Sequence, residues 1–232
     1  MSNMFCFQCQ QTAGNKGCVN TGVCGKQPET ARLQDELIGE LIRLATAAHD
    51  AGKHSHLTDR LLMDGLFTTL TNVNFDDEAI RKFTDRVINE RKKLRDEKIP
   101  VVALWDGSND EVSLRSTLLF GLKGMAAYAY HARVLGKTCQ EVDQFFYEAL
   151  YHLGEDEPQD VLLPLVLKTG AVNLKCLELL DHANTEAYGD PVPTEVPLTI
   201  EKGPFIVVSG HDLHDMKLLL EQTKDKGVNI YT

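Results

Sequence analysis

PETARLQDELIGELIRLATAAHDA, residues 28–51, is the stretch that decides the fold, because its apolar side chains recur at the spacing of one helical face. Four leucines and an alanine carry the repeat: Leu33, Leu37, Leu41, Leu44 and Ala48. Pro28 suits the first helical turn, where no backbone N–H is needed, and Gly52 suits the left-handed residue that follows a helix. We therefore predict a long amphipathic helix that begins at Pro28 and ends before Gly52.

The residues before this helix, 1–27, form a glycine-rich loop that holds four of the six cysteines of the chain at the spacing C-x2-C-x8-C-x5-C. These four are Cys6, Cys9, Cys18 and Cys24. Thiolates bind soft metals, and four of them in one short loop suit either a tetrahedral zinc ion or the four irons of a cubane cluster. The loop is therefore a candidate site for a metal or an iron–sulfur cluster.

Disulfides, zinc and an iron–sulfur cluster are the three interpretations of this loop. The start of the chain has neither the basic region nor the apolar run of a signal peptide, so we expect a cytoplasmic protein, in which disulfides are rare. Structural zinc usually takes two tight cysteine pairs, whereas Cys18 and Cys24 enclose five residues. Cluster sites accept irregular spacings more readily, so the spacing favours an iron–sulfur cluster and leaves zinc open.

A cluster held by four thiolates is anionic, so positive charge is expected near it. Lys16 and Lys26 lie in the loop, and the first amides of the helix at Pro28 would point back toward Cys24. The alternative is that both lysines are solvated. If Lys26 faces the cluster, its replacement by Glu should lower the reduction potential. Glycines in the loop would let backbone N–H groups approach the sulfurs: Gly14, Gly17, Gly22 and Gly25.

The helical spacing continues beyond Gly52 and predicts two further helices before the next break. The first covers about 57–71, and the second begins after Asp76, a suitable N-cap, and reaches Leu94. Turn residues in 98–109 then interrupt the pattern. We expect these helices to form a first three-helix bundle, 28–97.

A second bundle, 110–185, is predicted from the next three helical patterns. In the first, about 110–136, Gly121, Gly124 and Ala126 would allow a neighbouring helix to approach closely. The next has a capping box of Thr138 and Glu141. The last covers about 159–183, where Pro164 is acceptable only near the first turn. Together the bundles would make a helical domain, 28–190, in a mostly α protein.

The character of the chain changes in 191–232, where prolines exclude helix and mark an extended linker: Pro191, Pro193, Pro197 and Pro204. A buried strand at 205–208, a helix at 213–224 capped by Asp212 and a second strand at 228–231 then predict one parallel βαβ unit. Two strands and one helix cannot close a core. We therefore expect the start of a Rossmann-like domain that is truncated here, within a longer protein.

Composition narrows the possible partners. The formal charge of −10, without a basic stripe, argues against nucleic acid and anionic membranes. The basic run Arg91 to Arg95 is typical of a helix C-terminus. No uninterrupted apolar stretch reaches about 18 residues, so we expect no membrane span.

Other residues with possible chemistry have structural interpretations. His211 and His214 follow the first strand, where α/β sheets place ligands, but a turn role is favoured for both. Three further candidates are expected to be solvated: His54, His56 and Asp59. Four others are expected to pack within helices: His131, His152, Cys139 and Cys176.

Several short segments of the chain carry a resemblance to one family. The loop contributes MFCFQCQQTA (4–13), Gly17-Cys18 and Cys24-Gly25-Lys26. Further segments follow along the chain: LTNVNFD (70–76), GLKG (121–124), AAY (126–128), His131 with VLG (134–136), and SGHDL (209–213). In sequence and in order, these segments resemble those of the hybrid cluster proteins, also called prismane proteins or hydroxylamine reductases. The resemblance thus covers nearly the whole chain, although 98–109 is shorter than the matching region of the family.

This resemblance implies two three-helix bundles followed by Rossmann-like domains, an architecture related to the nickel–iron carbon monoxide dehydrogenases. Cys6, Cys9, Cys18 and Cys24 would hold a 4Fe–4S cluster, with no catalytic residue in this chain. A second, hybrid iron–sulfur–oxygen cluster, where hydroxylamine or nitric oxide is reduced, would have its ligands downstream of Thr232. The chain would then be the electron-input part of an oxidoreductase, fed by a redox donor protein and inactive alone. The alternatives are a helical interaction module pinned by zinc and a carbon monoxide dehydrogenase relative.

Overall fold

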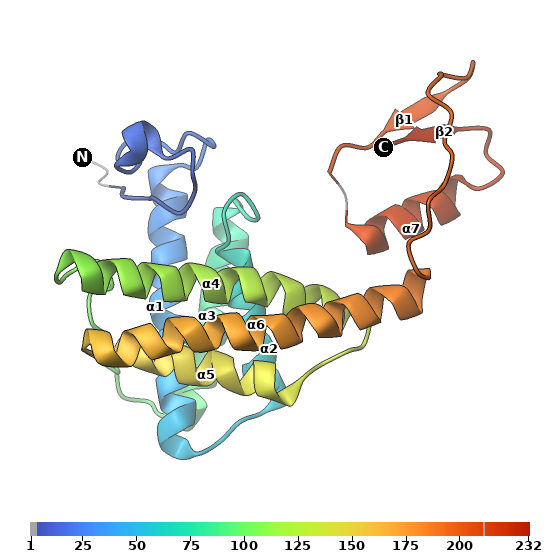
Figure 1. Cartoon of the computed structure of the whole chain (residues 1–232). Helices are drawn as coiled ribbons and strands as arrows, with labels where there is room; N and C mark the ends of the chain where they lie inside the picture. The colour runs from blue at the N-terminus through green and yellow to red at the C-terminus, as the bar shows by residue number, and fades with distance from the viewer. Residues whose placement is uncertain (1–3, 211) are drawn as a thin grey trace. The chain divides into compact units, whose positions relative to one another are not determined.

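The computed structural model describes residues 4–210 and 212–232, which form two compact units divided between Asp190 and Pro191. The first unit is helical, and the second contains a small parallel sheet (Figure 1). This confirms the predicted fold class, mostly α with a βαβ segment near the C-terminus. Within the described residues, no helix has the length and apolar character that crossing a membrane requires.

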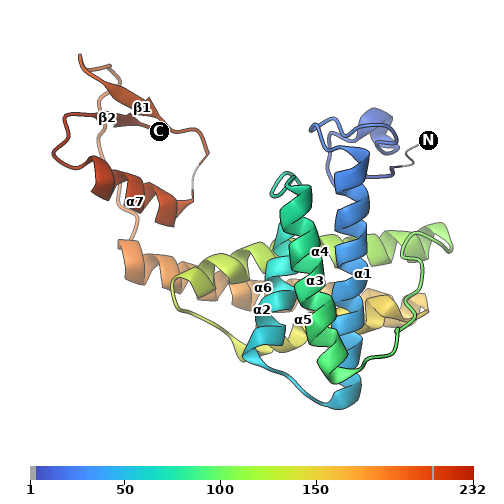
Figure 2. The same ribbon diagram turned by 180° about the vertical axis from the view of Figure 1, so that it is seen from behind.

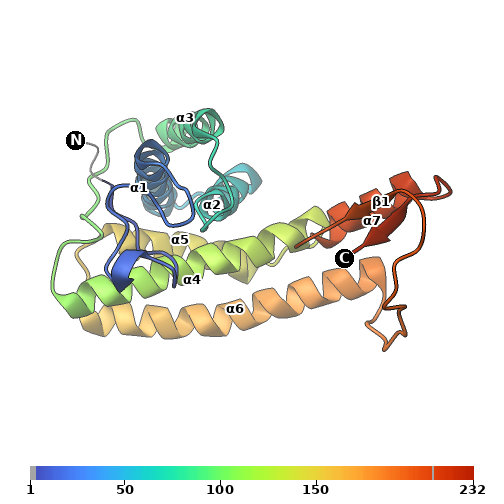
Figure 3. The same cartoon turned by 90° about the horizontal axis from the view of Figure 1, so that it is seen from above.

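Within residues 4–190, the described part of the helical unit, six α-helices lie in two sets of three that cross each other (Figure 3). The first set is α1 (Pro28–Ala51), α2 (His56–Thr68) and α3 (Asp77–Leu94), and the second is α4 (Asn109–Val134), α5 (Gln140–Gly154) and α6 (Gln159–Tyr188). One continuous apolar core joins the two sets, because α1 packs on α5 and α2 packs on α4. The two sets therefore stabilise each other rather than forming bundles with separate cores.

Helix ends follow the predicted signals with one exception. Gly52 adopts φ +59° after α1, and the Asp76 side chain accepts hydrogen bonds from the first amides of α3. The predicted capping box of Thr138 and Glu141 is wrong. Cys139 is the N-cap of α5, so Glu141 lies one position too early to reach back to the cap, and its carboxylate pairs with Lys175 instead.

Two expectations for α4 and α6 also need correction. Pro164 lies beyond the first turn of α6, and the helix continues through it. Pro164 has no N–H to donate to the carbonyl of Asp160, so the helix lacks one backbone hydrogen bond here. Gly121 does allow close approach, since a Cβ there would lie 3.2 Å from Cγ2 of Thr169, but Gly124 faces open space.

The second unit contains β1 (Phe205–Val207), α7 (Leu213–Thr223) and β2 (Asn229–Tyr231). The strands pair in parallel, with Ile206 opposite Ile230, and the Asp212 side chain caps α7 as predicted. The expectation of a buried first strand is wrong, because Phe205 and Val207 are 58% and 67% exposed. A single helix cannot cover both faces of a two-stranded sheet.

Candidate metal centre

The segment that carries the four cysteines leads into the N-terminal end of α1 (Figures 1 and 2). Cys6 and Cys18 are paired across an isolated antiparallel bridge, in which Cys6 N–H donates to Cys18 C=O at 3.0 Å and the reverse bond is 2.8 Å. Cys18 is buried, whereas Cys6, Cys9 and Cys24 are partly exposed, and all four thiols are free. The loop thus brings residues 12 positions apart side by side before α1 begins.

Hydrogen bonds around Cys18 favour its thiolate form. The Ala13 N–H donates to Sγ of Cys18 at 3.4 Å, and the Thr12 hydroxyl lies 3.8 Å from the same sulfur. The backbone at Ala13 and then at Val23, followed by the Thr12 hydroxyl, lowers the pKa of Cys18 below its ordinary value. The donor of the Cys18 bond is an alanine in the short 3-10 helix η1 (Ala13–Asn15) rather than one of the loop glycines. A thiolate that accepts a backbone N–H is suited to bind a metal or cluster.

Two loop glycines are required by close packing. A Cβ at Gly17, which adopts φ +126°, would lie 2.4 Å from the Phe5 ring. A Cβ at Gly22 would lie 3.0 Å from Sγ of Cys24. The glycines therefore let the loop fold tightly around its cysteines.

The spread of the donors separates the two kinds of metal site. In the described part of the chain, no three His, Cys, Asp or Glu side chains come together closely enough to hold one metal ion. A tetrahedral zinc ion, with Zn–S of about 2.3 Å, needs sulfurs only about 3.8 Å apart. A cubane attaches each thiolate to a different iron and so suits a wider arrangement. Four free thiols on one loop are a donor set that such a cluster uses.

Lys26 follows the last loop cysteine closely and is buried, with only 1% of its surface exposed. Its Nζ donates to Oε1 of Gln34 on α1 at 2.6 Å, and Nε2 of Gln34 donates to the carbonyl of Asn74 at 2.9 Å. The alternative that Lys26 is solvated is therefore wrong, whereas Lys16 is exposed as that alternative expects. Lys26 places a cation inside the protein, beside the cysteine loop.

Lys123 on α4 is a second buried lysine at this site, and sequence reasoning missed it. Its Nζ donates to Oε1 of Gln8 at 2.9 Å and to the carbonyl of Thr69 at 3.2 Å. Burial, followed by repulsion from Lys26, lowers the pKa of Lys123 to about 7. The sequence does contain a signal for its burial. Lys123 shares the core face of α4 with the buried residues Leu119, Leu122 and Ala126.

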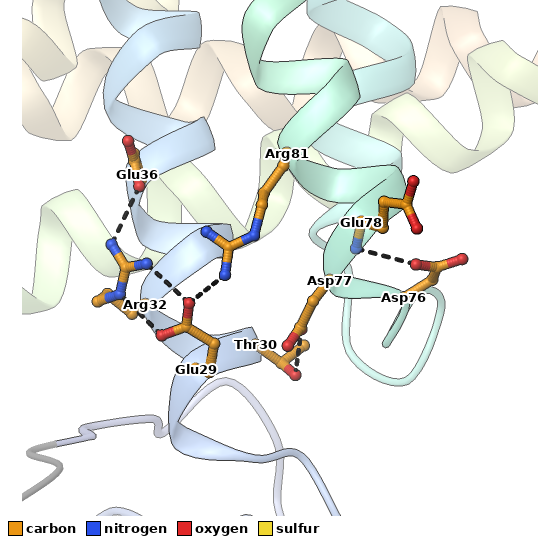
Figure 4. Close-up of polar contacts among 8 residues, drawn as sticks. All are labelled: Glu29, Thr30, Arg32, Glu36, Asp76, Asp77, Glu78 and Arg81. Atoms are coloured by element: carbon orange, nitrogen blue, oxygen red, sulfur yellow. Dashed lines mark hydrogen bonds and ion pairs between the residues drawn. The ribbon is translucent and has the colours of Figure 1, made fainter.

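A hydrogen bond and an ion pair connect the first turn of α1, next to the loop, to α3 (Figure 4). The Thr30 hydroxyl donates to Asp77 at 2.7 Å, and Glu29 pairs with both Arg32 and Arg81. Hydrogen bonds from Arg32 and then Arg81 lower the pKa of Glu29 to about 2. These contacts fix the end of the helix from which the loop departs.

The other candidate residues lie outside the cysteine loop. The His54 ring packs on Tyr147, whose hydroxyl donates to Asp59 at 2.6 Å, and His56 is exposed. His131 contacts the ring of Phe67, and Nδ1 of His152 lies 2.6 Å from Glu157. Cys176 is buried, which raises its pKa to about 12, whereas Cys139 is only partly buried. His214 is half-buried in the first turn of α7, and His211 lies outside the described residues.

Comparison with known proteins places this chain in a family. The model of the Prismane/CO dehydrogenase family matches residues 4–232, almost the whole chain. The chain belongs to the Prismane/CO dehydrogenase family. Relatives in this family include proteins named hydroxylamine reductase from Syntrophobacter fumaroxidans (45% identical) and Desulfovibrio desulfuricans (43% identical). A third protein of that name, from Methanocella arvoryzae, is 40% identical.

The family match covers this chain fully but its relatives only in part. The alignments include 99%, 100% and 99% of this chain, and 49%, 48% and 49% of these three relatives. The chain therefore spans about half the length of the relatives it matches. The first alignment extends over 264 positions, more than the 232 residues of the chain, so that prismane-family relative carries insertions relative to it.

Proposed function

We propose that this chain is the electron-input part of a hybrid-cluster-type oxidoreductase that reduces hydroxylamine or nitric oxide. The observation that carries the proposal is the loop of four free thiols, fixed at the start of α1, in a chain of the Prismane/CO dehydrogenase family. The name hydroxylamine reductase, borne by relatives 40–45% identical, supports this reaction over that of a carbon monoxide dehydrogenase.

In this proposal Cys6, Cys9, Cys18 and Cys24 hold a 4Fe–4S cluster. Such a cluster supplies reversible one-electron transfer. The residues of this chain hold the cluster and set its surroundings: Ala13 donates to the Cys18 sulfur, and Lys26 places a buried cation near the loop. No residue of the chain is assigned a catalytic role.

The proposed partners follow from this role. A redox donor protein in the cytoplasm would deliver the electron at the cysteine loop. The small nitrogen-containing substrate would meet the second, hybrid cluster in the full-length protein, so this chain alone would relay electrons without reducing that substrate. Nucleic acid and membranes are not among the proposed partners, since the net charge is −10.

The test is to load the chain anaerobically with iron and sulfide, reduce it, and mix it separately with hydroxylamine and with a one-electron acceptor such as ferricyanide. Visible absorbance follows the cluster, and ammonia is measured at the end. The proposal expects rapid oxidation by ferricyanide and no ammonia from hydroxylamine. Production of ammonia by this chain would contradict a role limited to electron input, and a loaded cluster that ferricyanide leaves reduced would contradict electron relay.

A further inference from the structure

Two buried lysines connect the cysteine loop to the helices, and each uses a glutamine. Lys123 of α4 donates to Gln8, which lies between Cys6 and Cys9, while Lys26 of the loop donates to Gln34 of α1. Each lysine is only 1% exposed. The four-cysteine loop is thus connected to the helices by two buried lysine side chains.

These buried ammonium groups have neutral partners. Among the described residues, neither Lys26 nor Lys123 forms an ion pair, and their hydrogen-bond acceptors are amide and carbonyl oxygens. A buried charge without a counter-charge is costly, and the two cations also repel each other. Asp35 attracts both lysines electrostatically but forms an ion pair with neither. Burial lowers the pKa of Lys123 to about 7, so its charged form lacks the close counter-charge that an anionic occupant of the adjacent loop would supply.

We infer that Lys123 is a positioning residue for the group bound by the four cysteines: it anchors Gln8 between Cys6 and Cys9 and supplies buried positive charge beside that group. This inference rests on the proposed function, because the anionic group is the cluster proposed there. A buried cation stabilises the reduced form, which carries one more negative charge, and so raises the reduction potential. Lys123 is placed for this because its Nζ is buried and directed at Gln8 from α4.

The test compares Lys123→Met, which removes the charge at similar length, with Lys123→Arg, which keeps it. Lys168→Met, on the exposed side of α6, is the control for removal of a distant lysine charge. Each chain is loaded anaerobically with iron and sulfide, and paramagnetic resonance follows the cluster during a redox titration. The comparison is made at the potential where half of the cluster in the unaltered chain is reduced. There we expect Lys123→Met to have a roughly tenfold lower ratio of reduced to oxidised cluster, which corresponds to a reduction potential lower by about 59 mV for a one-electron couple. Lys123→Arg and Lys168→Met should stay close to the unaltered chain.

A separate variant distinguishes anchoring from charge. Gln8→Leu keeps the Lys123 charge but removes its acceptor in the loop, so we expect a nearly unchanged potential and faster loss of iron to a chelator. Unchanged iron loss in this variant would overturn the anchoring role.

The remaining outcomes are also decisive. An unchanged potential in a fully loaded Lys123→Met chain would overturn the inference while leaving the proposed function intact. Failure of the unaltered chain to take up iron and sulfide would overturn both. If Lys123→Met folds poorly by circular dichroism, Lys123→Gln, a neutral donor, replaces it. Cluster loss in Met, Gln and Arg variants alike, with Lys168→Met intact, would make Lys123 a packing residue and overturn the inference.

Discussion

Nζ of Lys123 and Oε1 of Gln8 lie 2.9 Å apart, although 115 positions separate the two residues in the chain. The contact joins the middle of α4 to the segment between the first two loop cysteines. Lys123 and its second acceptor, the carbonyl of Thr69, are buried, whereas Gln8 is partly exposed. The cysteine loop is therefore part of the tertiary structure of the helical unit.

Removal of one loop thiolate should abolish cluster binding. We expect Cys18→Ser to retain less than about a tenth of the iron and sulfide of the unaltered chain, because Cys18 is the loop thiol whose sulfur accepts the Ala13 N–H. Cys139→Ser, outside the loop at the start of α5, is the matched control and should load normally. Iron and acid-labile sulfide analysis measures both, and equal loading of the two variants would contradict the assignment.

The position of Lys26 predicts a strong dependence of the potential on its charge. Lys26→Glu should lower the reduction potential of the cluster, since it replaces a buried cation by an anion. Lys16→Glu makes the same change at an exposed loop position, where water screens the charge, and should have a clearly smaller effect. Redox titrations of the two variants measure the difference, and equal shifts would show that burial of Lys26 has no influence.

Helix packing predicts opposite effects for two glycine substitutions. A Cβ at Gly65 of α2 would lie 2.7 Å from Cδ2 of Leu41 on α1, so Gly65→Ala should destabilise the chain by about 1–3 kcal/mol. A Cβ at Gly170 of α6 would meet no neighbouring atom within 4 Å, and Gly170→Ala should stabilise by about 0.5–1 kcal/mol. Urea unfolding followed by circular dichroism gives both values. A neutral Gly65→Ala would mean that α1 and α2 are not in such close contact.

The Glu29 carboxylate predicts a pH dependence. Its pKa is lowered from 4.5 to about 2, so the stability it contributes is fully present above about pH 4.5 and is lost as the pH falls through 2. The free energy of unfolding of the metal-free chain should therefore exceed that of Glu29→Gln at pH 6, by a small amount because the site is exposed. The difference should shrink as the pH falls toward 2. A difference that does not change between pH 6 and 2 would rule out the ion pairs of Glu29 as its source.

Sequence patterns predicted the helices of the fold well but not their association. Apolar spacing and capping residues such as Pro28, Gly52 and Asp76 act locally, so the ends of α1 and the start of α3 could be predicted. The packing of α1 on α5 depends on side-chain shape across the core, which periodicity does not reveal. The predicted capping box was wrong because the N-cap of α5 is Cys139, one residue after Thr138, and sequence patterns do not fix a helix start to one residue.

For the candidate site too, local features could be predicted from the sequence, whereas features that depend on tertiary packing could not. The cysteine spacing is local and identified the loop, but burial of Lys26 and the contact of Lys123 with Gln8 depend on how α1 and α4 meet the loop. Lysines are rarely buried, so solvation is the usual expectation for such residues. The lysine on the apolar face of α4 was the only sequence sign of the second cation.

The central claim, that Cys6, Cys9, Cys18 and Cys24 close around one iron–sulfur cluster, is tested most directly by metal and sulfide analysis of anaerobically prepared chain. The account predicts a brown protein with about four irons and four sulfides per chain, and a paramagnetic signal after one-electron reduction. A colourless protein with one zinc ion per chain and no sulfide would contradict it.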